Sequence, residues 1–138
     1  MPFDSDIPIS PLVSLIHRKQ TVYLNDKLKE VNLSSGLYPL LIKAYKNNGI
    51  SQEELASELY VNESTITRNL NKLENKGLVK KTPQKRKKII SVTDEGKKTA
   101  KKIMDIDKKW DSIIRKSLTD EEFQDFRKLL LKICEDLV

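Results

Sequence analysis

The chain has 138 residues, a single cysteine, and 26 lysines and arginines against 20 acids, for a net charge of +6. This length fits one domain with a substantial core, and one cysteine excludes an intrachain disulfide framework. No apolar run approaches the ~18 residues of a membrane span. The acidic start, MPFDSDIPIS, lacks the order of a signal peptide. We therefore expect a cytoplasmic protein that does not enter a membrane.

The positive charge is concentrated in one region. Residues 76–102 hold eleven lysines and arginines but only two acids, Asp94 and Glu95, so the rest of the chain has a net charge of −3. A local excess of this size is typical of a nucleic-acid-binding surface. The alternative is a solvated lysine face with no partner.

The N-terminal part predicts an irregular arm and two helices. Residues 1–10 contain two prolines, and Ser10 before Pro11 predicts the start of a helix that runs to about Glu30. A second helix is predicted over 37–45, with Ser34 or Ser35 as its cap. Asn47, Asn48 and Gly49 tolerate left-handed backbone and would end this helix.

Residues 51–77 predict two helices joined by a tight turn. Ser51 and Glu54 have the spacing of a capping box, and Asn62 suits the N-cap of the second helix. Gly77 suits its left-handed stop. Ile66, Leu70 and Leu73 keep helical spacing and predict the buried face.

The other face of this second helix carries hydroxyls, an amide and cations, without an acid. Such side chains suit a recognition helix that contacts bases and phosphates in a major groove. They are Ser64, Thr65, Thr67, Arg68, Asn71 and Lys72.

After Gly77 the pattern predicts a β-hairpin followed by two long helices. Short β-branched segments over 78–82 and 88–92 flank a basic tip over 83–87. Thr93 then caps a helix to about Lys116, and Thr119 with Glu122 forms a capping box for the last helix.

The first helix and the last two carry more apolar surface than a small helix-turn-helix core needs. These faces must be buried against something, and a second copy of the chain is the simplest partner. A two-fold dimer would also place two recognition helices about one DNA turn, ~34 Å, apart.

The whole pattern resembles the MarR family of transcriptional regulators. The similarity is densest in SQEELASELYVNESTITRNLNKLENKGLV and in VTDEG, residues 92–96. It implies a mainly α fold with a small β-hairpin wing: a winged helix-turn-helix over 34–93, and a helical dimerisation region formed by 1–33 and 94–138. It further implies a homodimer that binds pseudo-palindromic double-stranded DNA, usually as a repressor. Small aromatic ligands would release this homodimer from the DNA.

The resemblance also assigns the DNA contacts. The recognition helix, residues 62–76, would enter the major groove, and the wing, residues 83–88, would reach the minor groove. The family commonly has an Asp two residues before the tip Arg; Gln84 stands there before Arg86. Without this acid we expect binding that is more tolerant of sequence and more sensitive to salt.

Individual roles follow from side-chain chemistry. Arg68 is expected to contact a base, with a surface contact to Lys72 or Glu63 as the alternative. Asn71 and Lys72 are expected at phosphates, and Ser51 is expected to donate to a phosphate as well as cap its helix. The full predicted DNA-binding set is Ser51, Asn62, Ser64, Thr65, Thr67, Arg68, Asn71, Lys72, Lys85, Arg86, Lys87 and Lys88.

A small aromatic effector would have four polar aromatics available near the first two helices: His17, Tyr23, Tyr38 and Tyr45. The favoured alternative is that the tyrosines lie at the edge of the core. His17 is the sole histidine and has no ligand-rich cluster around it, so no metal and no cofactor is expected. Cys134 is expected to act as a small hydrophobic residue.

Two other classes of function fit the sequence less well. A winged-helix protein-interaction module would show an apolar patch on the recognition face, which is polar here. An enzyme would need a phosphate loop, a nucleophile–base pair or a metal-ligand spacing, and none is present in the sequence. The sequence therefore favours a dimeric DNA-binding regulator.

Overall fold

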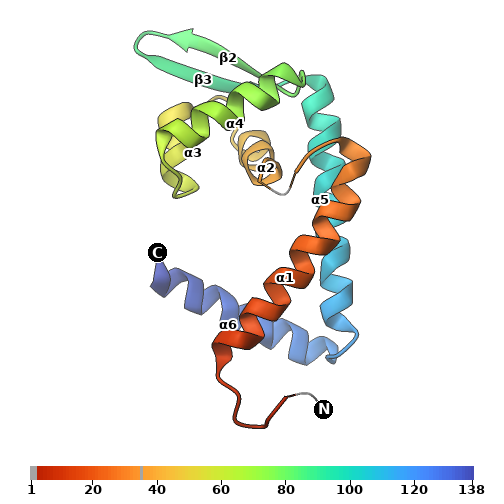
Figure 1. Cartoon of the computed structure of the whole chain (residues 1–138). Helices are drawn as coiled ribbons and strands as arrows, with labels where there is room; N and C mark the ends of the chain where they lie inside the picture. The colour runs from red at the N-terminus through yellow and green to blue at the C-terminus, as the bar shows by residue number, and fades with distance from the viewer. Residues whose placement is uncertain (1–2, 35) are drawn as a thin grey trace. The chain divides into compact units, whose positions relative to one another are not determined.

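The computed structural model describes residues 3–34 and 36–138. Two compact units make up the chain, residues 1–106 and 107–138. The fold is mostly helical with a small antiparallel sheet, as predicted (Figure 1). In chain order the elements are α1 (Ile9–Leu28), a 3-10 turn (Lys29–Val31), α2 (Tyr38–Lys46), β1 (Ile50–Ser51), α3 (Gln52–Glu58), α4 (Glu63–Asn75), β2 (Val79–Gln84), β3 (Lys87–Val92), α5 (Asp94–Arg115) and α6 (Asp120–Leu137).

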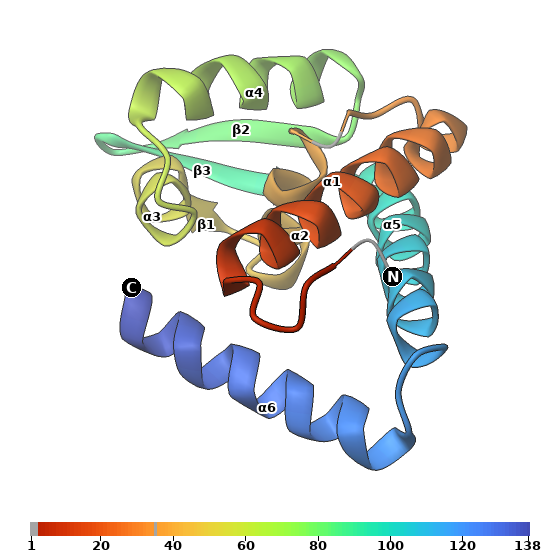
Figure 2. The same cartoon turned by 60° about the horizontal axis from the view of Figure 1, so that its bottom comes forward.

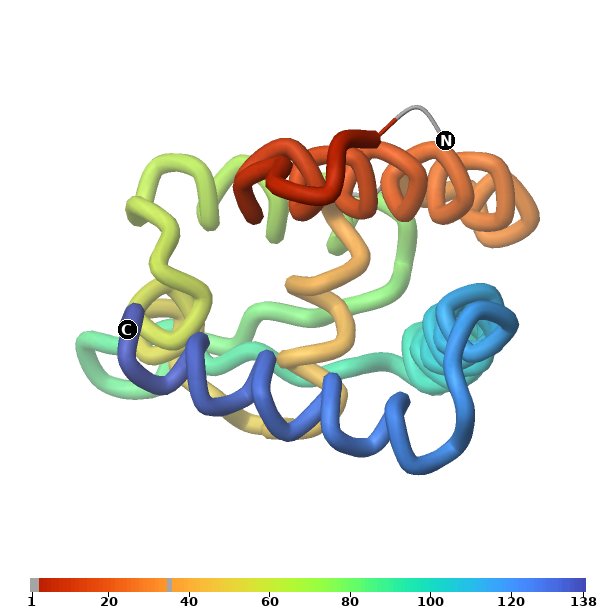
Figure 3. The backbone as a smooth tube through the Cα atoms, turned by 90° about the horizontal axis from the view of Figure 1, so that it is seen from below, coloured from red at the N-terminus to blue at the C-terminus, as the bar shows by residue number. Residues whose placement is uncertain are grey.

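Helix α1 runs without a break from Ile9 to Leu28 (Figure 3). It begins two residues before the predicted first helical residue, Pro11. Its N-cap is Pro8 in extended backbone, with no side-chain cap, so the prediction that Ser10 caps this helix is wrong. The physical reason is that the N–H groups of the first turn have no helical partner, so Pro11 is tolerated inside it. The 3-10 turn that follows ends at Asn32 in left-handed backbone, with φ 54°.

Helix α2 starts without a side-chain cap. Its N-cap is Leu37, and the backbone carbonyl of Ser34 accepts from the N–H groups of Leu37 and Tyr38 at 3.1 and 3.3 Å. The predicted hydroxyl cap from Ser34 is therefore wrong, because a backbone turn satisfies these donors instead. Ser35, the other predicted cap, lies outside the described residues.

The predicted hairpin is confirmed, but its tip is tighter. Strands β2 and β3 pair from Val79↔Val92 to Gln84↔Lys87, which leaves a two-residue tip instead of the predicted five. A third strand, β1, was not predicted; it pairs antiparallel with β3 and gives the order β1-β3-β2. Only two residues long, β1 shows no alternation in the sequence that would identify it.

The core of residues 1–106 gathers side chains from α1 to α5 and from the sheet. Those at or below 1% exposure are Leu28, Leu41, Ala44, Leu55, Ile66, Leu70, Leu73, Ile90, Ala100 and Ile103. Helix α5 approaches the segment after α4 so closely that a Cβ added at Gly96 would lie 2.0 Å from the carbonyl oxygen of Leu78. Only glycine fits at this contact, which ties α5 to the segment that follows α4.

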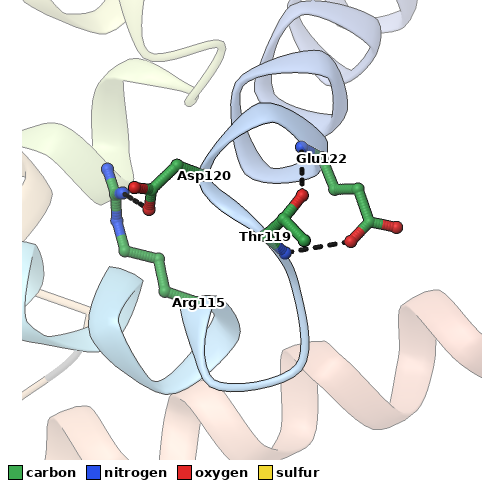
Figure 4. Close-up of polar contacts among 4 residues, drawn as sticks. All are labelled: Arg115, Thr119, Asp120 and Glu122. Carbon is green, nitrogen blue, oxygen red and sulfur yellow. Dashed lines mark hydrogen bonds and ion pairs between the residues drawn. The ribbon is translucent and has the colours of Figure 1, made fainter.

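The second unit, residues 107–138, is held by the corner between α5 and α6 (Figure 4). The predicted capping box is confirmed: Glu122 N donates to Thr119 Oγ1 at 3.1 Å, and Thr119 N donates to Glu122 Oε1 at 2.9 Å. Hydrogen bonding of the Glu122 carboxylate to the Thr119 backbone N–H, and secondly to its side chain, lowers the pKa of Glu122 below its usual 4.5. The Arg115 guanidinium pairs with Asp120 at 3.6 Å and lies 3.9 Å from the centre of the Phe123 ring.

Beyond this corner α6 exposes apolar side chains, among them Leu129, Leu130, Leu131, Ile133 and Leu137. None of the helices in the described residues is both long and apolar enough to cross a bilayer.

Candidate DNA-binding surface

Helix α3 begins at a serine that belongs to the sheet as well. Ser51 Oγ accepts from Glu54 N at 3.1 Å, which confirms the predicted N-cap, and donates to Glu54 Oε1 at 3.0 Å. Ser51 also lies in β1, paired with Ile89, and is only 2% exposed. This burial does not fit the predicted phosphate contact, and the structure places Ser51 as a cap.

The turn between α3 and α4 contains an unusual residue. Tyr60 has φ 55° and a side chain that is 76% exposed. Left-handed backbone is uncommon for a bulky residue and costs about 1–2 kcal/mol. After it, Asn62 caps α4 as predicted: its Oδ1 accepts from Thr65 N at 2.9 Å and from Ser64 Oγ at 2.8 Å.

Thr67 does not present a free hydroxyl to solvent. Its Oγ1 donates to the Glu63 carbonyl at 2.8 Å and accepts from Gln52 Nε2 at 2.8 Å. Thr67 thus joins α4 to the first residue of α3. The sequence did not single out Gln52, because its partner lies fifteen positions away. The other amide atom, Gln52 Oε1, is buried without a hydrogen-bond partner among the described residues.

Arg68 lies exposed on the outer face of α4. Its Nη2 donates to Thr65 Oγ1 at 3.3 Å, one turn back along the helix. The structure thus places it beside Thr65, and neither Lys72 nor Glu63 is the partner in this bond. An exposed arginine held along the helix axis remains able to reach a base edge. Ser64 and Lys72 are also exposed on α4.

Asn71 is engaged by the neighbouring strand. Lys81 Nζ in β2 donates to Asn71 Oδ1, and the backbone N–H of Lys81 donates to Glu74 Oε2 at 3.1 Å. Strand β2 runs alongside α4 in Figure 2, in agreement with these bonds. Neither Lys81 nor Glu74 was a predicted site residue, since only the tertiary structure brings β2 against α4.

The C-terminal end of α4 is tied to the helices on either side of the winged region. Lys76 Nζ donates to the carbonyl of Asn32 at 3.0 Å, just after α1. Gly77 has φ 74°, as predicted for the helix stop, and its carbonyl accepts from Thr93 Oγ1 at 2.6 Å. Thr93 also accepts from Gly96 N at 3.0 Å, which confirms it as the cap of α5.

The wing, formed by β2 and β3, carries four neighbouring cations that are exposed to solvent. Its tip projects past the N-terminal end of α4 (Figures 1 and 2). The side chains of Lys85, Arg86, Lys87 and Lys88 are all exposed. The last three share a hollow of about 170 Å³ with Ser51, Gln52, Glu53 and Glu63 at the start of α3 and α4. This hollow joins the wing to the helix-turn-helix as one surface.

The four aromatic residues predicted for an effector lie on α1 and α2. The tyrosines are half-buried and pack against the core: Tyr23, Tyr38 and Tyr45. Tyr23 Oη donates to the Ile106 carbonyl at 3.4 Å, and His17 is exposed. This arrangement matches the core-edge alternative for the tyrosines, and a ligand site among them stays a prediction.

A capped helix pair with a tight turn, followed by a basic two-stranded wing, defines the winged helix-turn-helix class. The family model described as MarR family matches residues 33–88. The HTH-type transcriptional regulator BilQ of Clostridioides difficile (strain CD3) is 30% identical over 125 residues, which are 88% of this chain and 84% of the relative. The chain therefore belongs to the MarR family of transcriptional regulators.

Solved structures agree with this family. A crystal structure of MarR matches with a TM-score of 0.88 and 28% identity, over 99% of this chain and 95% of the other. A putative MarR family regulator from Listeria monocytogenes, complexed with a 26mer DNA, matches with a TM-score of 0.84 and 26% identity. That match covers 95% of this chain and 89% of the other.

Proposed function

We propose that this protein is a homodimeric regulator that binds pseudo-palindromic operator DNA and represses transcription from the promoters it covers. The observation that carries the proposal is the exposed outer face of α4 beside the basic wing. Arg68 and Lys72 on α4 and the four cations of the wing, residues 85–88, are all solvent-exposed. Residues 64–72 contain no acid, so the charged side chains of this stretch, Arg68 and Lys72, attract phosphates.

The proposed DNA contacts fall into two kinds, those to bases and those to phosphates. Arg68 would pair with a base in the major groove, where its guanidinium matches guanine O6 and N7. Lys72 and the wing cations would neutralise phosphates and fix the register of the protein without reading sequence. Arg86 would enter the minor groove, where narrow A·T-rich stretches attract arginine. The Listeria relative crystallised with DNA supports this use of the surface.

The dimer is supported by apolar faces that one chain leaves uncovered. In α1, Ile9, Val13 and Ile16 recur at helical spacing and are 72%, 55% and 42% exposed. In α6, Leu130, Ile133 and Leu137 do the same at 43%, 54% and 78%. A soluble protein normally buries contiguous apolar surface of this kind. A second copy would cover both helices, with the dimerisation region formed by residues 1–33 and 94–138. Analytical ultracentrifugation at micromolar concentration tests the dimer directly.

The direct test of DNA binding is selection of bound duplexes from a random pool, followed by binding measurements over a range of salt concentrations. Recovery of a two-fold-symmetric motif, with a steep fall of affinity with salt, is the expected result. Recovery of no motif would favour a protein-interaction module. A shallow salt slope, equivalent to two or three phosphates, would contradict the basic wing as a DNA contact.

Release by a small aromatic acid is the regulatory part of the proposal, with His17, Tyr23, Tyr38 and Tyr45 as the residues near which it would bind. Benzoate titrated into the selected protein–DNA complex tests it. Dissociation at concentrations that leave a control complex intact supports release. Undiminished DNA binding at saturating benzoate contradicts release by this acid.

A further inference from the structure

Two carboxylates stand beside the cations of the wing. Glu53 in α3 and Glu63 in α4 line the hollow of about 170 Å³ that Arg86, Lys87 and Lys88 also line. All five side chains are exposed to solvent. Figure 2 shows α3 and the start of α4 at the end of the sheet where the wing tip lies. The three cations and two carboxylates sum to +1, whereas the cations alone carry +3.

The two acids act on the wing through the solvent between them. None of the ion pairs within 4 Å among the described residues involves Glu53 or Glu63. The hollow is comparable in size to the Debye length, which is ~8 Å at physiological salt, so its lining charges are not screened from one another. An acid on the helix-turn-helix and a cation on the wing therefore attract each other in the free protein.

Both acids also have an ordinary structural role. Each lies in the first turn of its helix, where a negative charge stabilises the positive end of the helix dipole. Glu95 has the same second helical position in α5 that Glu53 has in α3. Glu95 lines a different hollow, away from the wing cations. The helix-dipole role is thus common to all three acids, and only Glu53 and Glu63 combine it with a place beside the wing.

We propose that Glu53 and Glu63 are affinity-determining residues of the DNA-binding surface, internal anions that compete with DNA phosphates for the cations of the wing. The inference rests on the proposed function, because it requires the wing to meet phosphates. Phosphates must displace the two carboxylates, so the protein binds every duplex less tightly than its cations would allow. Since phosphate contacts supply most of the non-specific affinity, the acids limit attachment to DNA outside the operator.

The test measures binding of Glu53→Gln, Glu63→Gln and the double variant to the selected operator and to an unrelated duplex. Each change should raise the affinity for both duplexes by roughly two- to five-fold, the range of exposed charge pairs. The gain should shrink at high salt, where screening is stronger. Glu95→Gln is the matched control and should bind like the parent. Glu53→Asp and Glu63→Asp keep the charge and should also bind like the parent.

A double-mutant cycle separates competition for the wing from plain repulsion of DNA. Its two arms are Glu53→Gln/Glu63→Gln and the replacement of Arg86, Lys87 and Lys88 by glutamine. In urea unfolding of the free protein the two arms should be non-additive, because the attraction exists without DNA. In DNA binding, the gain from the acid-to-amide changes should largely disappear once the wing cations are gone.

Each other result is decisive. Additive arms in both measurements would show that the acids act on DNA alone, which overturns the inference. Unchanged or weaker DNA binding by the two acid variants also overturns it, because competing anions can only lower affinity. Should the parent protein bind DNA no better than its variant without the three wing cations, the proposed function of the wing fails. Non-additive unfolding would even then show the attraction between acids and cations, so the two failures are distinguishable.

Discussion

The Gln52 side-chain amide donates to the Thr67 hydroxyl at 2.8 Å and so joins the first residue of α3 to the recognition helix. The Thr67 hydroxyl in turn donates a hydrogen bond to the Glu63 carbonyl of its own helix. A residue that the sequence presents as a DNA contact therefore also links the two helices. The consequence can be measured by substitution at either end of the bond.

Gln52→Ala should lower the free energy of unfolding by about 1 kcal/mol, the usual net value of one hydrogen bond. It should also weaken binding of the selected operator, because α4 loses a support near its N-terminal end. Thr67→Val keeps the volume of the side chain and removes the hydroxyl. The two changes should be non-additive in a double-mutant cycle monitored by urea unfolding. Simple additivity would show that the bond contributes nothing in solution.

Arg68→Ala and Lys85→Ala should differ in kind. Loss of Arg68 should relax preference at one base pair of each half-site by about 1–3 kcal/mol, because a base contact carries sequence information. Loss of Lys85 should weaken all duplexes about equally and reduce the salt slope by about one. Fluorescence anisotropy on a panel of single-substitution operators measures both. Identical profiles for the two variants would contradict this division of roles.

Gly96→Ala should be strongly destabilising. Its new Cβ would lie 2.0 Å from the Leu78 carbonyl oxygen and 2.6 Å from Val92 Cγ1, so α5 must move. Overpacking of this kind costs about 1–3 kcal/mol. Gly36→Ala is the matched control, since its Cβ would meet only Ser34 Oγ, at 3.8 Å. Equal unfolding midpoints for both variants would mean that α5 tolerates the shift.

Tyr60→Gly should stabilise the protein relative to Tyr60→Ala, by about 1 kcal/mol, because left-handed backbone costs this much for a residue with a Cβ. Both variants remove the same exposed ring, so their difference isolates the backbone. Glycine loses more conformational freedom on folding, which offsets part of the gain. Thermal melting of the two variants gives the comparison, and a more stable alanine variant would show that Tyr60 is not strained in solution.

The α5–α6 corner should lose stability in acid. The pKa of Glu122 is lowered in the folded protein by its bonds to Thr119, so the carboxylate stabilises the fold above the ordinary pKa of 4.5. That contribution is lost as the pH falls through the lower, folded-state pKa. Glu122→Gln should therefore melt below the parent at neutral pH, and the gap should close in acid. A gap that is constant from neutral to strongly acidic pH would rule out titration of this group as its cause.

Much of the fold was predictable because its signals are local. Asn62 and Thr119 cap helices through bonds that span three residues, and Gly77 ends α4 with a backbone geometry that glycine favours. The basic hairpin follows from a short run of alternating residues. The resemblance to the MarR family is densest over residues 51–96, and the family match over residues 33–88 confirms it.

The sequence by itself determined where α4 lies and which side chains occupy its polar face. It could not determine which of them meet solvent. On this helix, Thr67 is bonded to Gln52 and Asn71 to Lys81. Outside it, the predicted contact Ser51 is buried in strand β1, which pairs with β3. The tertiary structure decided these outcomes, because each depends on a partner from another element. The physical reason is that one hydrogen bond between two elements reassigns a polar side chain without changing the helical pattern in which it stands.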